Sequence, residues 1–128
     1  MNLAQIVEIR SHGTIDPGWI GVDLDGTLAR FKGWEAPDVI GAPIPKMVAR
    51  VKAWLKQGKD VRIFTARISV GDGTTKQDAE KAKKAIDKFC LKVFGKKLSV
   101  TNQKSHTMVE LWDDLAHGVQ TNTGRRVK

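Results

Sequence analysis

IGVDLDGTLA, residues 20–29, places two aspartates two positions apart directly after a short apolar run. Ile20 and Val22 precede the acids, and Gly26 follows them. A run of this kind is typical of a buried parallel strand that leads into a turn. We therefore expect a strand that ends at Asp23 and Asp25, so that two negative charges stand at the end of a buried element.

The length of the chain, 128 residues, is that of one domain with one hydrophobic core. We expect residues 1–15 to be a loose amino-terminal extension and residues 16–128 to form the domain. Cys90 is the only cysteine and falls on the apolar stripe of a predicted helix, so a reduced core thiol is expected. No apolar stretch reaches the roughly 18 residues of a membrane span. The sequence therefore predicts a cytoplasmic protein with no membrane partner.

Positive charge is concentrated in one part of the chain. The formal net charge is +8, and residues 76–97 hold eight lysines against three acidic residues. Two interpretations remain open at this point. The lysines can form a solvated helix face that keeps the protein soluble, or they can attract a polyanion such as nucleic acid.

Helices and strands alternate along the rest of the sequence. Helical apolar spacing predicts helices over residues 45–57, with Gly58 just past the end, and over residues 76–94, with Thr75 as the cap and Gly95 as the stop. Further strands are predicted at residues 61–64, 97–100, 108–112 and 118–121. This order predicts an α/β fold, Rossmann-like with three layers and a mostly parallel central sheet.

Polar side chains follow the predicted strands where each of them ends. Asp23 and Asp25 end the first strand, Thr65 ends the second, and Asp113 and Asp114 end the strand at 108–112. These ends share one edge of a parallel sheet. Carboxylates that converge there repel one another, so either their pKa values rise or a cation neutralises them. Because oxygen ligands without His or Cys favour Mg²⁺, we expect a magnesium site with bound phosphate.

Several other polar residues can contact that phosphate. Lys104 supplies a positive charge, and Thr65 offers its hydroxyl and the amide of Ala66 beyond it. Arg67 either reaches the phosphate or pairs with an acid. Trp34 lies in residues 31–41, which we call the flap, and it either anchors the flap or offers a stacking surface to a base.

Four motifs in this order resemble those of the haloacid dehalogenase superfamily. DLDGTL resembles the first motif and VRIFT, ending at Thr65, resembles the second. Lys104 matches the third motif, and ELWDD resembles the acidic fourth. The resemblance covers about residues 19–120, which is nearly the whole chain. Lys104 departs from the pattern because it lies in a loop without a clear helix, only a few residues before the fourth strand.

The resemblance implies a phosphoric monoester hydrolase, that is, a phosphatase that forms an aspartyl-phosphate. Asp23 would be the nucleophile and Asp25 the general acid and base, while Thr65 and Lys104 would hold the phosphoryl group. Mg²⁺ would be bound by the Asp23 carboxylate, the Asp25 backbone carbonyl and Asp113, with Asp114 supporting or sharing that role.

The chain has no room for the cap domains that usually give members of this superfamily their substrate specificity. The resemblance implies that capless members act on large substrates or borrow a lid from another subunit. The sequence is therefore compatible with both a monomer and a homo-oligomer. The expected substrate is a nucleotide or nucleic-acid terminal phosphate. Two alternatives are a small metabolite such as a sugar phosphate, and a basic nucleic-acid-binding module with a vestigial phosphatase site.

Overall fold

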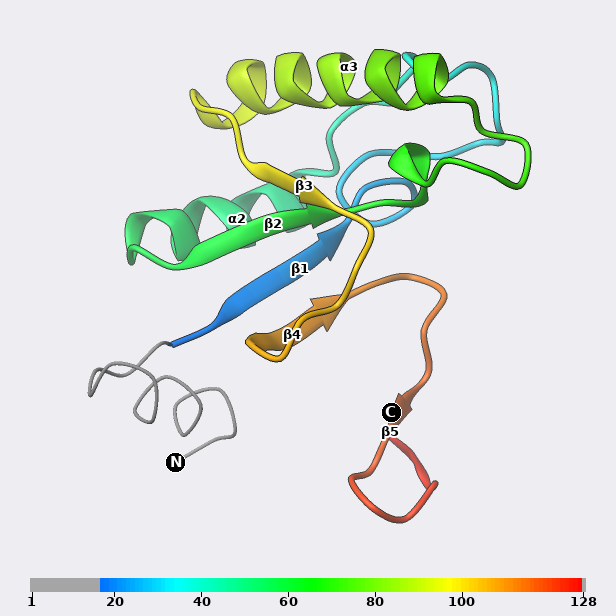
Figure 1. Ribbon diagram of the computed structural model, residues 1–128. Coiled ribbons are helices and arrows are strands. Elements are labelled where there is room, and N and C mark those ends of the chain that lie inside the picture. Colours follow the sequence, from blue (N-terminus) through cyan, green and yellow to red (C-terminus); the bar gives the residue numbers. More distant parts are fainter. Residues whose placement is uncertain (1–16, 128) are drawn as a thin grey trace.

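The computed structural model describes residues 17–127 (Figure 1). The expected amino-terminal extension, residues 1–15, lies outside them. The elements follow one another along the chain as β1 (Trp19–Asp23), α2 (Pro45–Lys56), β2 (Asp60–Phe64), the short 3₁₀ helix η1 (Ala66–Ile68), α3 (Lys76–Phe94), β3 (Ser99–Thr101), β4 (Met108–Trp112), β5 (Gly118–Val119) and β6 (Arg126–Val127).

Four of the strands form a parallel sheet in the order β3-β2-β1-β4. Ile20 lies opposite Val61 and Val22 opposite Ile63, so the β-branched residues of the two central strands share one face. The α/β class with a mostly parallel central sheet is therefore confirmed. The predicted last strand is shorter than expected, and β5 pairs with β6 in a separate antiparallel hairpin rather than with the sheet.

Strand β4 contains a bulge where it pairs with β1. Trp19 lies opposite Met108, but Ile20 lies opposite Glu110, so Val109 is an extra residue on the β4 side. From Glu110 onward the pairing is regular, and Val22 lies opposite Trp112. A bulge of this kind bends and twists the strand that carries it. Here it lies at the end of the sheet opposite to the aspartates.

The helix ends follow the predicted signals. Pro45 occupies the first turn of α2. A backbone N–H at this position has no acceptor within the helix, so proline loses no hydrogen bond there. The Thr75 hydroxyl accepts a 3.1 Å hydrogen bond from the backbone N–H of Asp78 and caps α3. Gly95 ends α3 with φ of 76°, and its N–H donates to the carbonyl of Leu91.

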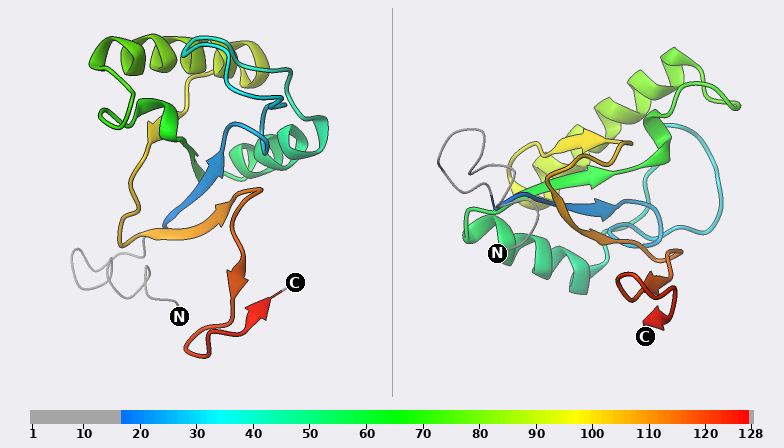
Figure 2. Two further views of the ribbon diagram at one scale, coloured as in Figure 1. Left: turned by 90° about the vertical axis from the view of Figure 1, so that its right-hand side faces the viewer. Right: turned by 60° about the horizontal axis from the view of Figure 1, so that its bottom comes forward.

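Helices α2 and α3 pack on the same face of the sheet (Figure 2). Two successive right-handed connections that move in one direction along a sheet place both helices on that side. Buried residues of both helices form one core with the sheet, including Val51 of α2 and Ile86 and Cys90 of α3. Cys90 is the expected core thiol, and burial raises its pKa to about 11. Within residues 17–127 the opposite face carries no helix, and there the Arg62 guanidinium lies 4.5 Å from the ring centroid of the buried Trp19.

Among the helices in the described part of the chain, none has the length and apolarity needed to cross a membrane.

Candidate functional site

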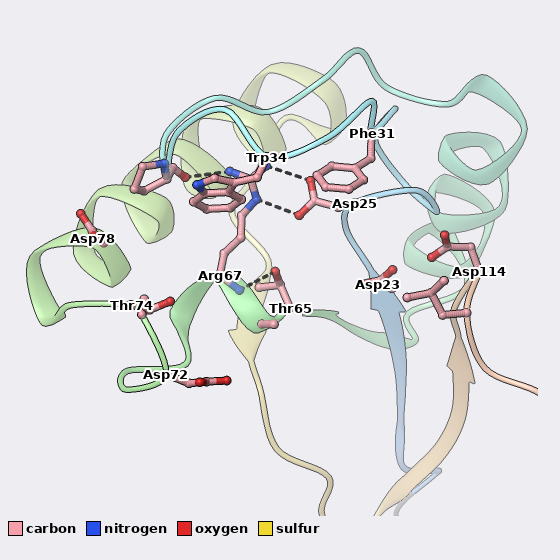
Figure 3. Close-up of a pocket in the computed structure, with 14 residues that line it drawn as sticks. Asp23, Asp25, Phe31, Trp34, Thr65, Arg67, Asp72, Thr74, Asp78 and Asp114 are labelled. Carbon is pink, nitrogen blue, oxygen red and sulfur yellow. Dashed lines mark hydrogen bonds and ion pairs between the residues drawn. The ribbon is translucent and has the colours of Figure 1, made fainter.

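A cavity of about 570 Å³ opens at the carboxyl ends of the central strands (Figure 3). The last residue of β1, Asp23, and the turn after it, with Asp25, contribute to its lining, and the segment after β2 contributes Thr65, Ala66 and Arg67. The flap, the loop between η1 and α3, and the segment after β4 complete the wall. Most of the residues predicted from the ends of the strands therefore come together around one space.

Three carboxylates gather on the β1 and β4 side of this cavity. Oxygen atoms of Asp23, Asp113 and Asp114 all lie within 4.8 Å of one another. The cause is the pairing of β1 with β4, because Val22 lies opposite Trp112 and the next residue on each strand is an aspartate. The Asp113 carboxylate also accepts a 2.8 Å hydrogen bond from the backbone N–H of Leu115, which fixes the chain beyond it.

Thr27 joins the turn after β1 to the end of β4. Its hydroxyl lies 3.3 Å from Asp23 Oδ2 and 3.2 Å from Asp114 Oδ1, and it accepts a 3.0 Å hydrogen bond from the backbone N–H of Asp114. Gly26 allows the approach, since it has φ of +87° and a Cβ there would lie 2.5 Å from Asp114 Oδ2. The turn is held by the backbone N–H of Ala29, which donates to the carbonyl of Leu24 at 2.8 Å.

Burial, together with the crowding of the carboxylates, raises the pKa of Asp23 from 3.8 to about 7. Burial is the largest cause, followed by the hydrogen bond with Asp114 and the negative charges of Asp113 and Asp114. The hydrogen bond from Thr27 acts in the opposite direction. Asp23 therefore lies in an excess of negative charge that a cation would relieve.

These residues fit a magnesium ion. The donor set is made of carboxylate oxygens, which Mg²⁺ prefers, and the raised pKa of Asp23 marks uncompensated negative charge. The Asp25 carboxylate does not belong to this cluster because it is held elsewhere. Its expected contribution, through the backbone carbonyl, stays a prediction.

Arg67 holds the Asp25 carboxylate through two hydrogen bonds. Nε donates to Oδ2 at 2.8 Å and Nη2 donates to Oδ1 at 2.9 Å, while the arginine side chain is only 5% exposed. The sequence left open whether Arg67 reaches phosphate or pairs with an acid. In this structure it pairs with Asp25 while still lining the cavity.

The same arginine fixes the flap. Nη1 of Arg67 donates to the carbonyls of Ala36 and Pro37 at 3.1 and 2.8 Å, and the guanidinium lies 4.9 Å from the ring centroid of Trp34. Trp34 therefore anchors the flap through Arg67, which is one of the two roles expected for it. Its side chain is nevertheless exposed, at 60%, and it lines the cavity.

Thr65 and Ala66 lie on the wall between Asp23 and Arg67. Thr65 is buried, its N–H donates to the carbonyl of Thr101 at 2.9 Å, and its hydroxyl accepts from the N–H of Arg67 at 3.1 Å. Ala66 is exposed and also lines the cavity. Both residues thus stand where the sequence predicted phosphate contacts, although contact with a phosphate stays a prediction.

Lys104 is placed differently. It is an exposed residue of the loop between β3 and β4, and it is not among the residues that line the cavity. His106, in the same loop, is exposed as well. The role of Lys104 as a phosphate ligand therefore stays a prediction.

Other residues of the cavity were not predicted. Asp72 and Thr74 lie in the loop between η1 and α3, where Gly71 pairs with Thr74 in a turn, and this loop forms a wall of the cavity. Asp78, Phe31 and Leu115 line the cavity as well. The signal that could have found Asp72 and Asp78 is their position beyond the carboxyl end of β2, in the loop before α3 and in the first turn of α3 respectively.

No protein-family model matches the chain, and no curated protein matches it. A solved structure described as a conserved protein from Bacteroides thetaiotaomicron is similar, with a TM-score of 0.52 and 20% sequence identity. The match covers 79% of this chain and 78% of the other. At this identity the likeness shows a shared fold.

Proposed function

We propose that the protein is a magnesium-dependent phosphoric monoester hydrolase that works through an aspartyl-phosphate, as its resemblance to the haloacid dehalogenase superfamily implies. The observation that carries the proposal is the placement of two aspartates, two residues apart, in one cavity. Asp23 lies against the carboxylates of Asp113 and Asp114, and Asp25 lies against the Arg67 guanidinium. A cation among the three carboxylates would keep Asp23 ionised for attack, and Arg67 would position the Asp25 carboxylate.

Asp23 would be the nucleophile. Its carboxylate oxygen forms a bond to phosphorus while the bond from phosphorus to the leaving oxygen breaks, which leaves the phosphoryl group on Asp23. Asp25, which must release the Arg67 guanidinium to carry a proton, gives that proton to the leaving oxygen. Ionised Asp25 then takes a proton from a water molecule that attacks phosphorus, so Asp23 is released, inorganic phosphate is formed and Asp25 is protonated again.

Asp23, Asp113 and Asp114 would hold Mg²⁺, with the Asp25 carbonyl as the further expected ligand. When bound, the ion supplies positive charge beside the phosphoryl oxygens. Thr65 and Ala66 line the wall where the hydroxyl and amide can contact those oxygens. Arg67 orients the Asp25 carboxylate, and its bonds to Ala36 and Pro37 keep the flap over the same space.

The experiment that tests this proposal is phosphate release from para-nitrophenyl phosphate, measured with Mg²⁺ and with a chelator. We expect turnover that requires Mg²⁺, no turnover for Asp23→Asn, and a loss of at least about 10²-fold for Asp25→Asn. Asp60→Asn is the matched control, because Asp60 pairs with Arg62 at the start of β2 and does not line the cavity. Turnover that survives in Asp23→Asn or in chelator would refute the mechanism.

A second candidate, a nucleic-acid-binding module, is supported by the exposed lysines of α3. Lys81, Lys84, Lys88 and Lys92 are exposed along the helix. Such a face adds affinity for nucleic acid that falls steeply with salt. If oligonucleotides bind in a salt-dependent manner while no phosphate ester is hydrolysed at any Mg²⁺ concentration, this second function replaces the first.

A further inference from the structure

The cavity has an apolar, largely aromatic rim that the proposed chemistry does not use. Phe31 and Trp34 line the cavity from the flap and Leu115 lines it from the segment after β4, with exposed fractions of 48%, 60% and 82%. Figure 3 shows Phe31 and Trp34 along one edge of the space, and Asp72 and Thr74 along another. Large apolar side chains exposed at the mouth of a polar cavity mark a surface for a ligand.

Trp34 is held ready for stacking. The Arg67 guanidinium lies against its ring, and the carbonyls of Ala36 and Pro37 fix that guanidinium. Because Arg67 is itself fixed by Asp25, the indole is positioned by a rigid group rather than by the flap alone. A flat ring that enters the cavity can then stack on the indole with little loss of conformational entropy.

The charges in the cavity select against extra phosphates. Of the residues that line it, five are aspartates and one is an arginine, and that arginine is already paired with Asp25. Asp72 and Asp78 lie on the wall away from the cluster, and neither pairs with a cation among the described residues. None of the lysines of α3 lines the cavity. The region beyond the transferred phosphate thus offers hydrogen-bond acceptors and negative potential.

We infer that the substrate is a monophosphate ester whose leaving group is a flat heteroaromatic compound bearing hydroxyl or amino groups and no second phosphate. A nucleoside or a hydroxylated pyridine ring has this chemistry. The ring stacks on Trp34, and the hydroxyl or amino groups donate to Asp72 and Asp78. Nucleoside diphosphates and nucleic-acid ends are disfavoured, because they place further negative charge beside these carboxylates. The inference names the substrate class of the proposed phosphatase and rests on that function.

The test compares kcat/KM for phosphate release at saturating Mg²⁺ and constant ionic strength. AMP and pyridoxine 5′-phosphate represent the two sources of a flat leaving group. Glucose 6-phosphate lacks the flat ring, while ADP and a 5′-phosphorylated oligonucleotide add negative charge. We expect at least one flat monophosphate to exceed the other three compounds by about 10-fold or more. Equal or faster turnover of glucose 6-phosphate, ADP or the oligonucleotide overturns the inference.

Variants of Trp34 and Asp72 test whether these two cavity residues cause the preference for a flat monophosphate. Trp34→Ala should weaken binding of the preferred flat monophosphate by about 10-fold, whereas Trp34→Phe, which keeps an aromatic ring, should weaken it much less. Asp72→Asn should raise kcat/KM of ADP relative to AMP by a few fold at low salt, and this gain should vanish at high salt. Asn suits this position because Asp72 has φ of 48°. Unchanged affinity in Trp34→Ala, or an unchanged ADP to AMP ratio in Asp72→Asn, counts against the inference.

Binding measured without turnover separates the two proposals. Calorimetry with the Asp23→Asn protein reports affinity for AMP and glucose 6-phosphate when no phosphate is released. If wild type hydrolyses no ester, including para-nitrophenyl phosphate, the phosphatase proposal fails, and with it the assignment of a leaving group. If esters are hydrolysed but Asp23→Asn binds glucose 6-phosphate as tightly as AMP, only the leaving-group inference fails.

Discussion

Arg67 and Asp25 form a paired, two-point contact in which Nε and Nη2 donate to the two carboxylate oxygens at 2.8 and 2.9 Å. The residues are 42 positions apart in the sequence, and the contact joins the turn after β1 to η1. The Arg67 side chain is 5% exposed and that of Asp25 is 20% exposed, so removing one partner leaves a poorly hydrated charge.

Arg67→Ala is therefore expected to lower the free energy of unfolding by about 3 kcal/mol, the cost of breaking a buried ion pair. Arg62→Ala is the matched control, because Arg62 also pairs with an aspartate at 2.8 Å and lies over a tryptophan, but its pair is 33% and 47% exposed. The control should lose less than about 1 kcal/mol. Urea denaturation measures both values, and equal losses would contradict the buried role of the Asp25 pair.

The raised pKa of Asp23 predicts how stability depends on pH in the absence of metal. Between about pH 4 and pH 7 the folded protein retains a proton on Asp23 that the unfolded chain has released. Stability from this group is therefore present at pH 4 and is lost as the pH rises through 7. Thermal denaturation of metal-free protein should show this fall in wild type and not in Asp23→Asn. Added Mg²⁺ should raise the Tm of wild type more at pH 8 than at pH 5.

Gly26→Ala should weaken Mg²⁺ binding by about 10-fold or more, because the added Cβ would displace the Asp114 carboxylate that lies 2.5 Å from it. Gly58→Ala separates this effect from backbone strain. Gly58 has a similar φ, +78°, but a Cβ there meets nothing within 4 Å. Calorimetric titration with Mg²⁺ should show normal affinity for Gly58→Ala. Loss of affinity in both variants would mean that strain, not the Asp114 contact, is responsible.

Lys104→Ala tests the assignment made from the sequence motifs alone. If Lys104 contacts substrate phosphate, its removal should raise KM for para-nitrophenyl phosphate by about 10-fold, which is typical of a lost charge-assisted hydrogen bond. Lys97→Ala serves as the control, since Lys97 is also exposed and precedes β3. Identical kinetics for the two variants would remove Lys104 from the proposed site.

Local signals in the sequence were sufficient to predict the two α-helices and the four strands of the central sheet, but not η1 or β6. Thr75 and Gly95 act within one helical turn of α3, so a cap and a stop can be recognised without knowledge of the tertiary structure. The aspartates after β1 and β4 were also predictable, because parallel strands bring their carboxyl ends to one edge of the sheet. The pairing partner of β5 was not, because a two-residue strand carries little pattern.

The contacts within the site were harder to predict. Thr27 contacts Asp114 across 87 positions and Arg67 contacts Asp25 across 42, and neither contact leaves a local pattern. The choice between phosphate and an acid as the partner of Arg67 depends on how the turn after β1 approaches η1. Lys104 was assigned by the order of motifs, which does not fix the direction of a loop residue.

The extra residue in β4 determines how far along the sheet the carboxylates of Asp113 and Asp114 lie. Because Val109 is bypassed, Val22 lies opposite Trp112, and Asp113 comes level with Asp23. Without the bulge at Val109, Trp112 would lie opposite Asp23. Asp113 would then lie one strand position, about 3.3 Å, further along the sheet and on its other face. The affinity for the proposed divalent cation would therefore also report strand alignment, because the bulge brings Asp113 level with Asp23.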